Sequence, residues 1–235
     1  MPVTPEEHLS GFVVAIDGPS GSGKSSVSKQ VARRLGYGFL DTGAMYRALT
    51  WWSLHEGVDL TDADAVTAAA QRFPLLIGTD PDASVVEVDG IDVSAAIRET
   101  RISTNVSAVA AIIPVREILR LLQRRLISEA GRARGGVVAE GRDITTVVAP
   151  DAPVRILLTA SEEARLARRS KELHGAADAD AVAATRSQIV DRDRADSAVS
   201  EFTVAADGVT TIDTSHLDFE GSVEAVLSVV EGARA

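Results

Sequence analysis

Short apolar runs alternate with segments of helical period along most of the chain. The runs are rich in Val, Ile and Leu and lack polar alternation, which is typical of buried parallel strands. They cover Phe12–Ile16, Tyr37–Leu40, Val137–Ala139, Val154–Leu158 and Val209–Ile212. The segments between them place apolar residues at helical spacing, as in Val27, Val31 and Leu35 before the stop signal Gly36. This alternation predicts a doubly wound α/β fold.

One stretch breaks this rhythm. Val85, Val86 and Val88 precede the dipeptide Asp89-Gly90, and apolar residues follow it. Such a pair between two apolar runs predicts an antiparallel hairpin with a two-residue turn. An antiparallel hairpin inside an α/β chain indicates a small insertion, which we place at residues 73–101.

Composition limits the partners. The 235 residues include no Cys, 45% are apolar, and 24 Lys and Arg against 34 Asp and Glu give a net charge of −10. The absence of Cys excludes thiol chemistry and Cys-ligated zinc, and no apolar run is long enough to span a bilayer. The acidic balance argues against a nucleic-acid or membrane surface. We therefore expect a cytoplasmic protein.

The strongest local signal follows the first predicted strand and opens the first predicted helix. It matches the phosphate-loop pattern G-x-x-x-x-G-K-[ST] with residues Gly18, Pro19, Ser20, Gly21, Ser22, Gly23, Lys24 and Ser25, followed by Ser26. Backbone N–H groups of such a loop and the helix N-terminus cradle a polyphosphate. Lys24 is expected to reach the β- and γ-phosphates, and the Ser25 hydroxyl to bind Mg²⁺. The motif predicts a site for ATP and Mg²⁺.

The acceptor must be inferred from other segments. The Asn-Lys-x-Asp segment of a GTPase is absent. The run Val137–Ala139 ends in Glu140-Gly141-Arg142-Asp143, and Leu40 is followed by Asp41-Thr42-Gly43 with Arg47 a few residues on. Because ligands of open α/β sheets bind beyond the carboxyl ends of the strands, these segments should face the phosphate loop. Arginines at that edge favour a kinase for a small phosphorylated acceptor.

Together these motifs resemble the bacterial cytidylate kinases. The resemblance rests on Ile16–Ser25, Leu40–Arg47, the hairpin segment Asp92–Ser94 to Ile97-Arg98, Glu140–Ile144 with Thr146–Val148 and Pro150–Ala152, and the pair Arg192-Asp193 with Asp196-Ser197. It extends from about Phe12 to Ser215. It implies a P-loop NTPase fold with a five-stranded parallel sheet, a lid and a small antiparallel insertion that binds the nucleoside monophosphate. The implied reaction is phosphoryl transfer from ATP to CMP or dCMP.

The same resemblance implies roles for individual residues. Thr42 and Arg47 would contact the acceptor, and Ser107, Arg116 and Asp143 would read the cytosine. Arg142 would hold the transferring or acceptor phosphate. Arg192 and Asp196 would engage the acceptor's ribose and phosphates. With Lys24, Arg142 and Arg192 form the expected catalytic set.

The resemblance also implies a division of the chain. Residues 11–72, 102–160 and 193–235 would form the core, 73–101 the monophosphate-binding insertion and 161–192 the lid. Arg165, Arg168 and Arg169 have i, i+3 and i+4 spacing, which puts them on one helix face, and the lid arginines would close over ATP. After Ser197 the sequence departs from the family, because Val199 occupies the position of an expected phosphate-binding Arg.

Two alternatives remain open. The first is a P-loop kinase for another acceptor, such as UMP, AMP or shikimate. The second is a nucleotide-gated binding module, in which Arg47 would be an ordinary surface residue. The 21 Arg against 3 Lys favour a focused phosphate site, because a guanidinium binds phosphate with two parallel hydrogen bonds. We expect a monomer acting on a small metabolite.

Overall fold

A five-stranded parallel sheet forms the centre of the computed structural model, which describes residues 8–174, 193, 197 and 202–235. The strand order is β2-β6-β1-β7-β8, and every neighbouring pair is parallel. These strands are β1 (Phe12–Asp17), β2 (Gly38–Asp41), β6 (Gly136–Gly141), β7 (Val154–Thr159) and β8 (Thr210–Asp213). Each contains most of one predicted apolar run, so the predicted doubly wound sheet is confirmed.

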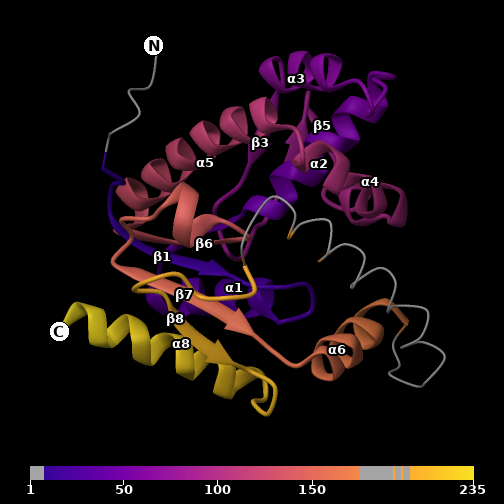
Figure 1. Ribbon diagram of the computed structural model, residues 1–235. Helices are drawn as coiled ribbons and strands as arrows, with labels where there is room; N and C mark the ends of the chain where they lie inside the picture. The colour runs from indigo at the N-terminus through magenta and orange to yellow at the C-terminus, as the bar shows by residue number, and fades with distance from the viewer. Residues whose placement is uncertain (1–7, 175–192, 194–196, 198–201) are drawn as a thin grey trace.

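Helices cover both faces of this sheet (Figure 1). The described helices are α1 (Lys24–Leu35), α2 (Thr42–His55), α3 (Ala63–Gln71), α4 (Thr100–Ala110), α5 (Ile113–Arg134), α6 (Glu162–His174) and α8 (Phe219–Arg234), with the short turns η1 (Ala96–Arg98) and η2 (Ile144–Val148). α5 lies on one side of the sheet and α8 on the other (Figure 1). The strands are therefore covered by helices on both faces of the sheet.

The central strand β1 explains why its sequence has no polar alternation. Val14 and Ile16 pack into a core with α1 and α8, whereas Val13 and Ala15 pack into a second core with α2 and α5. Successive side chains of a strand point to opposite faces, so a strand buried on both faces needs apolar residues throughout. Asp17 is the last residue of β1, so the phosphate loop that follows it lies at the carboxyl edge of the sheet.

A separate three-stranded antiparallel sheet follows α3. It has the order β3-β4-β5 and consists of β3 (Leu75–Ile77), β4 (Val86–Val88) and β5 (Ile91–Asp92). Asp89 and Gly90 have φ of 51° and 75°, the left-handed conformation that a tight hairpin turn requires. The predicted hairpin is confirmed. Its apolar side chains share one core with those of α2, α3, α4 and the start of α5.

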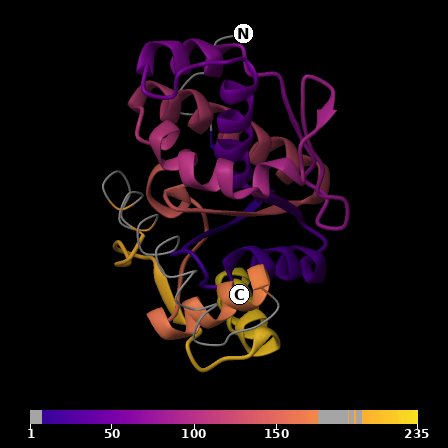
Figure 2. The ribbon, with the colours of Figure 1, turned by 90° about the vertical axis from the view of Figure 1, so that its right-hand side faces the viewer.

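The two helical groups sit at opposite ends of the molecule. Figure 2 shows the purple and magenta helices of the antiparallel-sheet group at one end and the yellow α8 at the other. The phosphate loop follows β1 and α2 follows β2, so both begin at the carboxyl edge of the parallel sheet. This edge is where ligands of open α/β sheets bind.

Candidate active site

Two glycines let the phosphate loop pass closely beneath the neighbouring chain. Gly21 and Gly23 have φ of 75° and 88°, which an L side chain rarely adopts. A Cβ on Gly21 would also lie 2.7 Å from the carbonyl oxygen of Arg165 on α6. The loop and the start of α6 are therefore in contact. Gly23 is the residue before α1, so the helix N-terminus points at the loop.

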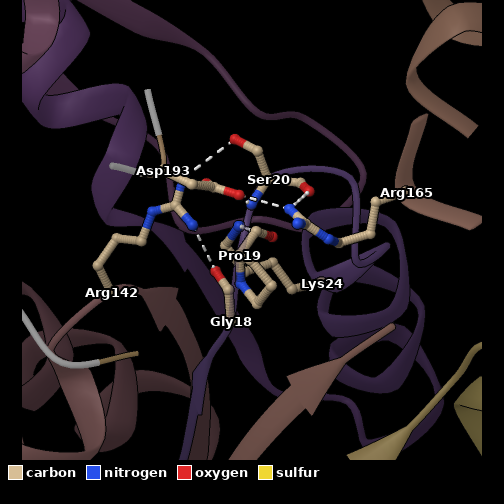
Figure 3. A network of polar contacts seen from close by, with 7 residues as sticks. All are labelled: Gly18, Pro19, Ser20, Lys24, Arg142, Arg165 and Asp193. Atoms are coloured by element: carbon tan, nitrogen blue, oxygen red, sulfur yellow. Dashed lines mark hydrogen bonds and ion pairs between the residues drawn. The ribbon is translucent and has the colours of Figure 1, made fainter. Parts of the chain in front are cut away.

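Figure 3 shows a network of polar side chains around the loop. Lys24 Nζ donates to the carbonyl oxygen of Pro19 at 3.3 Å. Arg142 donates to the carbonyl oxygen of Gly18 at 2.8 Å and to Ser20 Oγ at 3.0 Å. Arg165 donates to the carbonyl oxygen of Ser20 at 2.9 Å. Three cationic side chains from α1, the end of β6 and α6 thus converge on one loop.

The buried carboxylate of Asp17 explains why Arg142 reaches this position. Asp17 accepts hydrogen bonds from the backbone N–H groups of Ile144 and Thr145 at 2.9 and 2.8 Å. These bonds fix the turn that follows β6, and Arg142 lies at its start. The aromatic ring of Phe202 lies 4.3 Å from the Arg142 guanidinium carbon, so the cation is also held from the other side.

The helix α6 brings a second arginine to the loop. Arg168 donates to the carbonyl oxygen of Ser22 at 3.2 Å and to the hydroxyl of Thr214 at 2.9 Å. Ser161 caps the N-terminus of this helix, because its Oγ accepts a hydrogen bond from the N–H of Ala164. The side chain of Arg169 lies outside the described part of the chain, as do Arg192, Asp196 and Val199.

Ser25 and Glu140 form the oxygen-rich corner of the site. Ser25 Oγ donates to Glu140 Oε1 at 2.6 Å. Burial, reinforced by the negative charge of Asp41, raises the pKa of Glu140 to about 7. A hydroxyl and a carboxylate at the phosphate loop are hard oxygen donors that suit Mg²⁺. The residues present therefore fit the ion that the loop motif implies.

The raised pKa of Glu140 gives a pH dependence of stability. The unfolded chain releases this proton near pH 4.5, whereas the folded chain holds it until about pH 7. The unfolded state binds fewer protons in this window, so the free energy of unfolding falls as the pH rises through it. The variant Glu140→Gln lacks this titrating group. In metal-free buffer we therefore expect its free energy of unfolding, relative to that of the wild type, to increase by up to about 3 kcal/mol between pH 4.5 and pH 8. Urea unfolding at several pH values measures this difference, and a pH-independent difference would contradict it.

The acceptor side begins at the end of β2. Arg47 Nη2 donates to Asp41 Oδ2 at 3.0 Å, and both side chains are largely buried. Burial raises the pKa of Asp41, but several groups together outweigh it and hold that pKa below its ordinary value: the charges of Arg47, Arg98 and Lys24 and the hydrogen bond from the N–H of Ala44. Arg47 Nε is buried and has no hydrogen-bond partner among the described residues. Thr42 donates its hydroxyl to the carbonyl oxygen of Glu140 at 2.8 Å, which ties β2 to β6.

The predicted base-reading residues lie in two places. Arg116 Nη2 donates to Asp143 Oδ2 at 2.6 Å, which brings α5 to the end of β6. Burial raises the pKa of Asp143 to about 6, although Arg116 opposes the shift. Partial burial raises the pKa of the nearby Tyr46, and the charge of Asp143 acts in the same direction. Ser107 lies on α4 and lines the cleft described next.

One cleft of about 1120 Å³ joins the loop to the acceptor side. Its walls include residues 20–26 of the loop, Asp41, Arg47, Glu140 and Arg142. The antiparallel sheet and α4 close the far wall, where Arg98 and Ser107 lie. A cleft of this size exceeds the usual range for a drug-sized ligand, as a site for two nucleotides would require.

Sequence reasoning did not assign roles to several residues of this site. Asp41 ends β2 and Glu140 lies one residue before the end of β6, positions that indicate proximity to ligand in an open sheet. Arg98 belongs to a segment of the predicted insertion that resembles the family, but the resemblance gave it no role of its own. Asp193 and Phe202 come from segments remote in sequence, and only the folded chain brings them to Arg142.

No helix within the described residues is both long and apolar enough to cross a membrane. The same residues contain no cluster of three or more His, Cys, Asp or Glu side chains arranged to hold a metal ion.

Fold and site together define a P-loop phosphotransferase: a glycine-rich loop after the central strand and the cationic side chain of Arg47 line one cleft. The family model described as "Cytidylate kinase" matches residues 14–232. A cytidylate kinase of Streptomyces avermitilis is 50% identical over 95% of this chain and 94% of its own, and one of Rhodococcus opacus is 49% identical over 94% and 95%. The chain belongs to the cytidylate kinase family, and its reaction is phosphoryl transfer to CMP or dCMP.

Proposed function

We propose that the transfer takes place in the cleft between the phosphate loop and Arg47, with ATP at the loop and the monophosphate opposite. The observation that carries this proposal is that cationic side chains line one cleft in two places. Lys24 and Arg142 lie at the loop, and Arg47 lies across from them. The unpartnered Nε of Arg47 is a donor that a phosphate oxygen would satisfy.

The chemistry needs little from a general base. An acceptor phosphate is already anionic near neutral pH, so catalysis consists of positioning the two phosphates and offsetting their charge. The donor phosphates would be contacted by Lys24, Arg165, Arg168 and Arg169. Arg142 would hold the transferring or acceptor phosphate, and Arg47 would contact the acceptor phosphate. Arg192 and Asp196 would complete the acceptor site.

Ser25 would hold Mg²⁺, with Glu140 beside it. The ion, when bound, supplies positive charge to the phosphate oxygens of ATP. The Ser25 hydroxyl donates a hydrogen bond to the carboxyl group of Glu140, which fixes the direction of that hydroxyl. Loss of the Glu140 proton would leave a charged oxygen donor at the same corner.

Arg116, Asp143 and Ser107 would read the cytosine. A carboxylate accepts from the cytosine amino group, whereas uracil has a carbonyl at the same ring position. The Arg116 contact holds Asp143 at the end of β6 and leaves its second oxygen for a base. Thr42 would contact the acceptor through the lone pairs of its hydroxyl oxygen, because the hydroxyl already donates its hydrogen bond to the backbone carbonyl oxygen of Glu140.

The remaining proposals concern the chain as a whole. Residues 73–101 would form the monophosphate-binding part and 161–192 the lid, within a monomer that acts in the cytoplasm. The absence of Cys suits a reducing compartment, and the net charge of −10 opposes nucleic-acid binding.

An acceptor panel tests the base-reading proposal. The wild type should phosphorylate CMP and dCMP at least about 100-fold more efficiently than UMP, AMP or shikimate. A site built to bind the cytosine amino group rejects UMP and shikimate, which lack an amino group, and the larger purine of AMP places its amino group elsewhere. Asp143→Asn should lower kcat/KM for CMP by about 10- to 100-fold and narrow the margin over UMP. A coupled assay of ADP formation measures both quantities.

The exposed Asp151 provides a control of equal charge change. It precedes β7, at the edge of the sheet opposite the phosphate loop. Asp151→Asn should leave the CMP-to-UMP ratio unchanged. If Asp143→Asn also leaves that ratio unchanged, the cytosine is read elsewhere, even though phosphoryl transfer stands.

A further inference from the structure

The carboxylate of Asp193 lies directly against the phosphate loop (Figure 3). Its Oδ1 accepts a hydrogen bond from the backbone N–H of Ser20 at 3.1 Å. The same oxygen lies 3.2 Å from Arg142 Nη2, and its Oδ2 accepts from Arg165 Nη1. The side chain is only 13% exposed. One carboxylate thus takes a loop N–H group and two guanidiniums as partners.

This donor set is the one that a phosphoryl group requires. Inward N–H groups of a phosphate loop bind phosphate oxygens, and arginines bind both carboxylates and phosphates through the same planar fork. Asp193 presents two anionic oxygens to those donors. Its position is therefore that of an anion at the loop, not that of a surface ion pair.

The two arginines do not depend on Asp193 for their place. Arg142 also donates to the carbonyl oxygen of Gly18 and stacks on Phe202. Arg165 also donates to the carbonyl oxygen of Ser20. Removing the carboxylate would leave both guanidiniums anchored to the loop. What it would remove is the negative charge that offsets them.

We propose that Asp193 is an internal substitute for a phosphate: it occupies an anion position at Ser20, Arg142 and Arg165, and the phosphates of the incoming nucleotide displace it. The inference rests on the proposed placement of ATP at the loop. When the phosphates displace Asp193, the same donors bind phosphate oxygens in place of carboxylate oxygens, and the arginines stay where they are. Asp193 competes with the nucleotide and weakens its binding.

Calorimetric titration of inorganic pyrophosphate and of ATP, each without acceptor, tests this competition. Asp193→Asn keeps the shape and one accepting oxygen but removes the charge. We expect it to bind both probes about tenfold more tightly than the wild type, and the gain to shrink as salt screens the charges. Asp151→Asn makes the same charge change at the opposite edge of the sheet and should alter either affinity less than about twofold.

The direction of the change separates competition from a structural role. A residue needed only to hold the arginines would weaken binding when replaced, so unchanged or weaker binding by Asp193→Asn overturns the proposal. If the wild type binds neither probe, the placement of ATP at the loop fails as well. Should circular dichroism show that Asp193→Asn is unfolded, Asp193→Ser takes its place, with the same gain expected.

Discussion

Replacement of Lys24 by Met should lower kcat by about 100- to 1000-fold while the protein remains folded, because a preorganised charge next to the transferred group is lost. This corresponds to roughly 3–4 kcal/mol of transition-state stabilisation. Lys24 has its ammonium at the carbonyl oxygen of Pro19, inside the loop. Met keeps most of the side-chain volume, so packing of the loop should change little. Steady-state kinetics with saturating CMP and ATP measures the loss.

Lys171→Met is the matched control. Lys171 lies on α6 and is exposed, and its replacement removes the same charge from the same residue type. We expect its kcat to stay within about twofold of the wild type, because Lys171, although within the proposed lid, is exposed and is not among the residues that line the cleft. A similar loss in both variants would show that overall charge matters rather than the position of Lys24. A loss smaller than tenfold in Lys24→Met would remove it from the catalytic set.

The sheet could be predicted because its signals are local. Residues 12–16 are apolar throughout because both faces of β1 are covered, and Gly36 ends α1 in the left-handed conformation that its lack of a side chain allows. The hairpin at Asp89-Gly90 follows from the same kind of short-range turn chemistry. Such features require no knowledge of the rest of the chain.

The site could be predicted only in part, since much of it depends on long-range contacts. Periodicity on α5 makes Arg116 one of several arginines, and only folding pairs it with Asp143. Arg142 and Asp143 are adjacent in sequence, yet they diverge. Arg142 turns to the phosphate loop, while Asp143 turns to α5. Asp193 reaches Ser20 across 173 positions of sequence, a contact that no local pattern encodes.

The divergence of Arg142 from Asp143 gives a second strong prediction. Arg142 touches Gly18, Ser20 and Phe202, so its guanidinium stands between the donor loop and the acceptor side of the cleft. Arg142→Met should lower kcat by about 100-fold, because an always-charged fork is lost where phosphate charge is offset. Arg142→Lys restores the charge but not the fork, and we expect it to recover less than about tenfold.

Arg155 offers a matched control for this substitution. Its guanidinium also donates to backbone carbonyl oxygens, those of Thr145 and Asp207, but it does not line the cleft. Arg155→Met should therefore lower the melting temperature about as much as Arg142→Met while leaving kcat within a few-fold of the wild type. Thermal melts and steady-state kinetics on the same preparations separate these effects. Arg155 is not placed to contact a transferring phosphate, so a kcat loss in Arg155→Met could come only from lower stability. Equal kcat losses in the two variants would therefore mean that Arg142 also acts through stability.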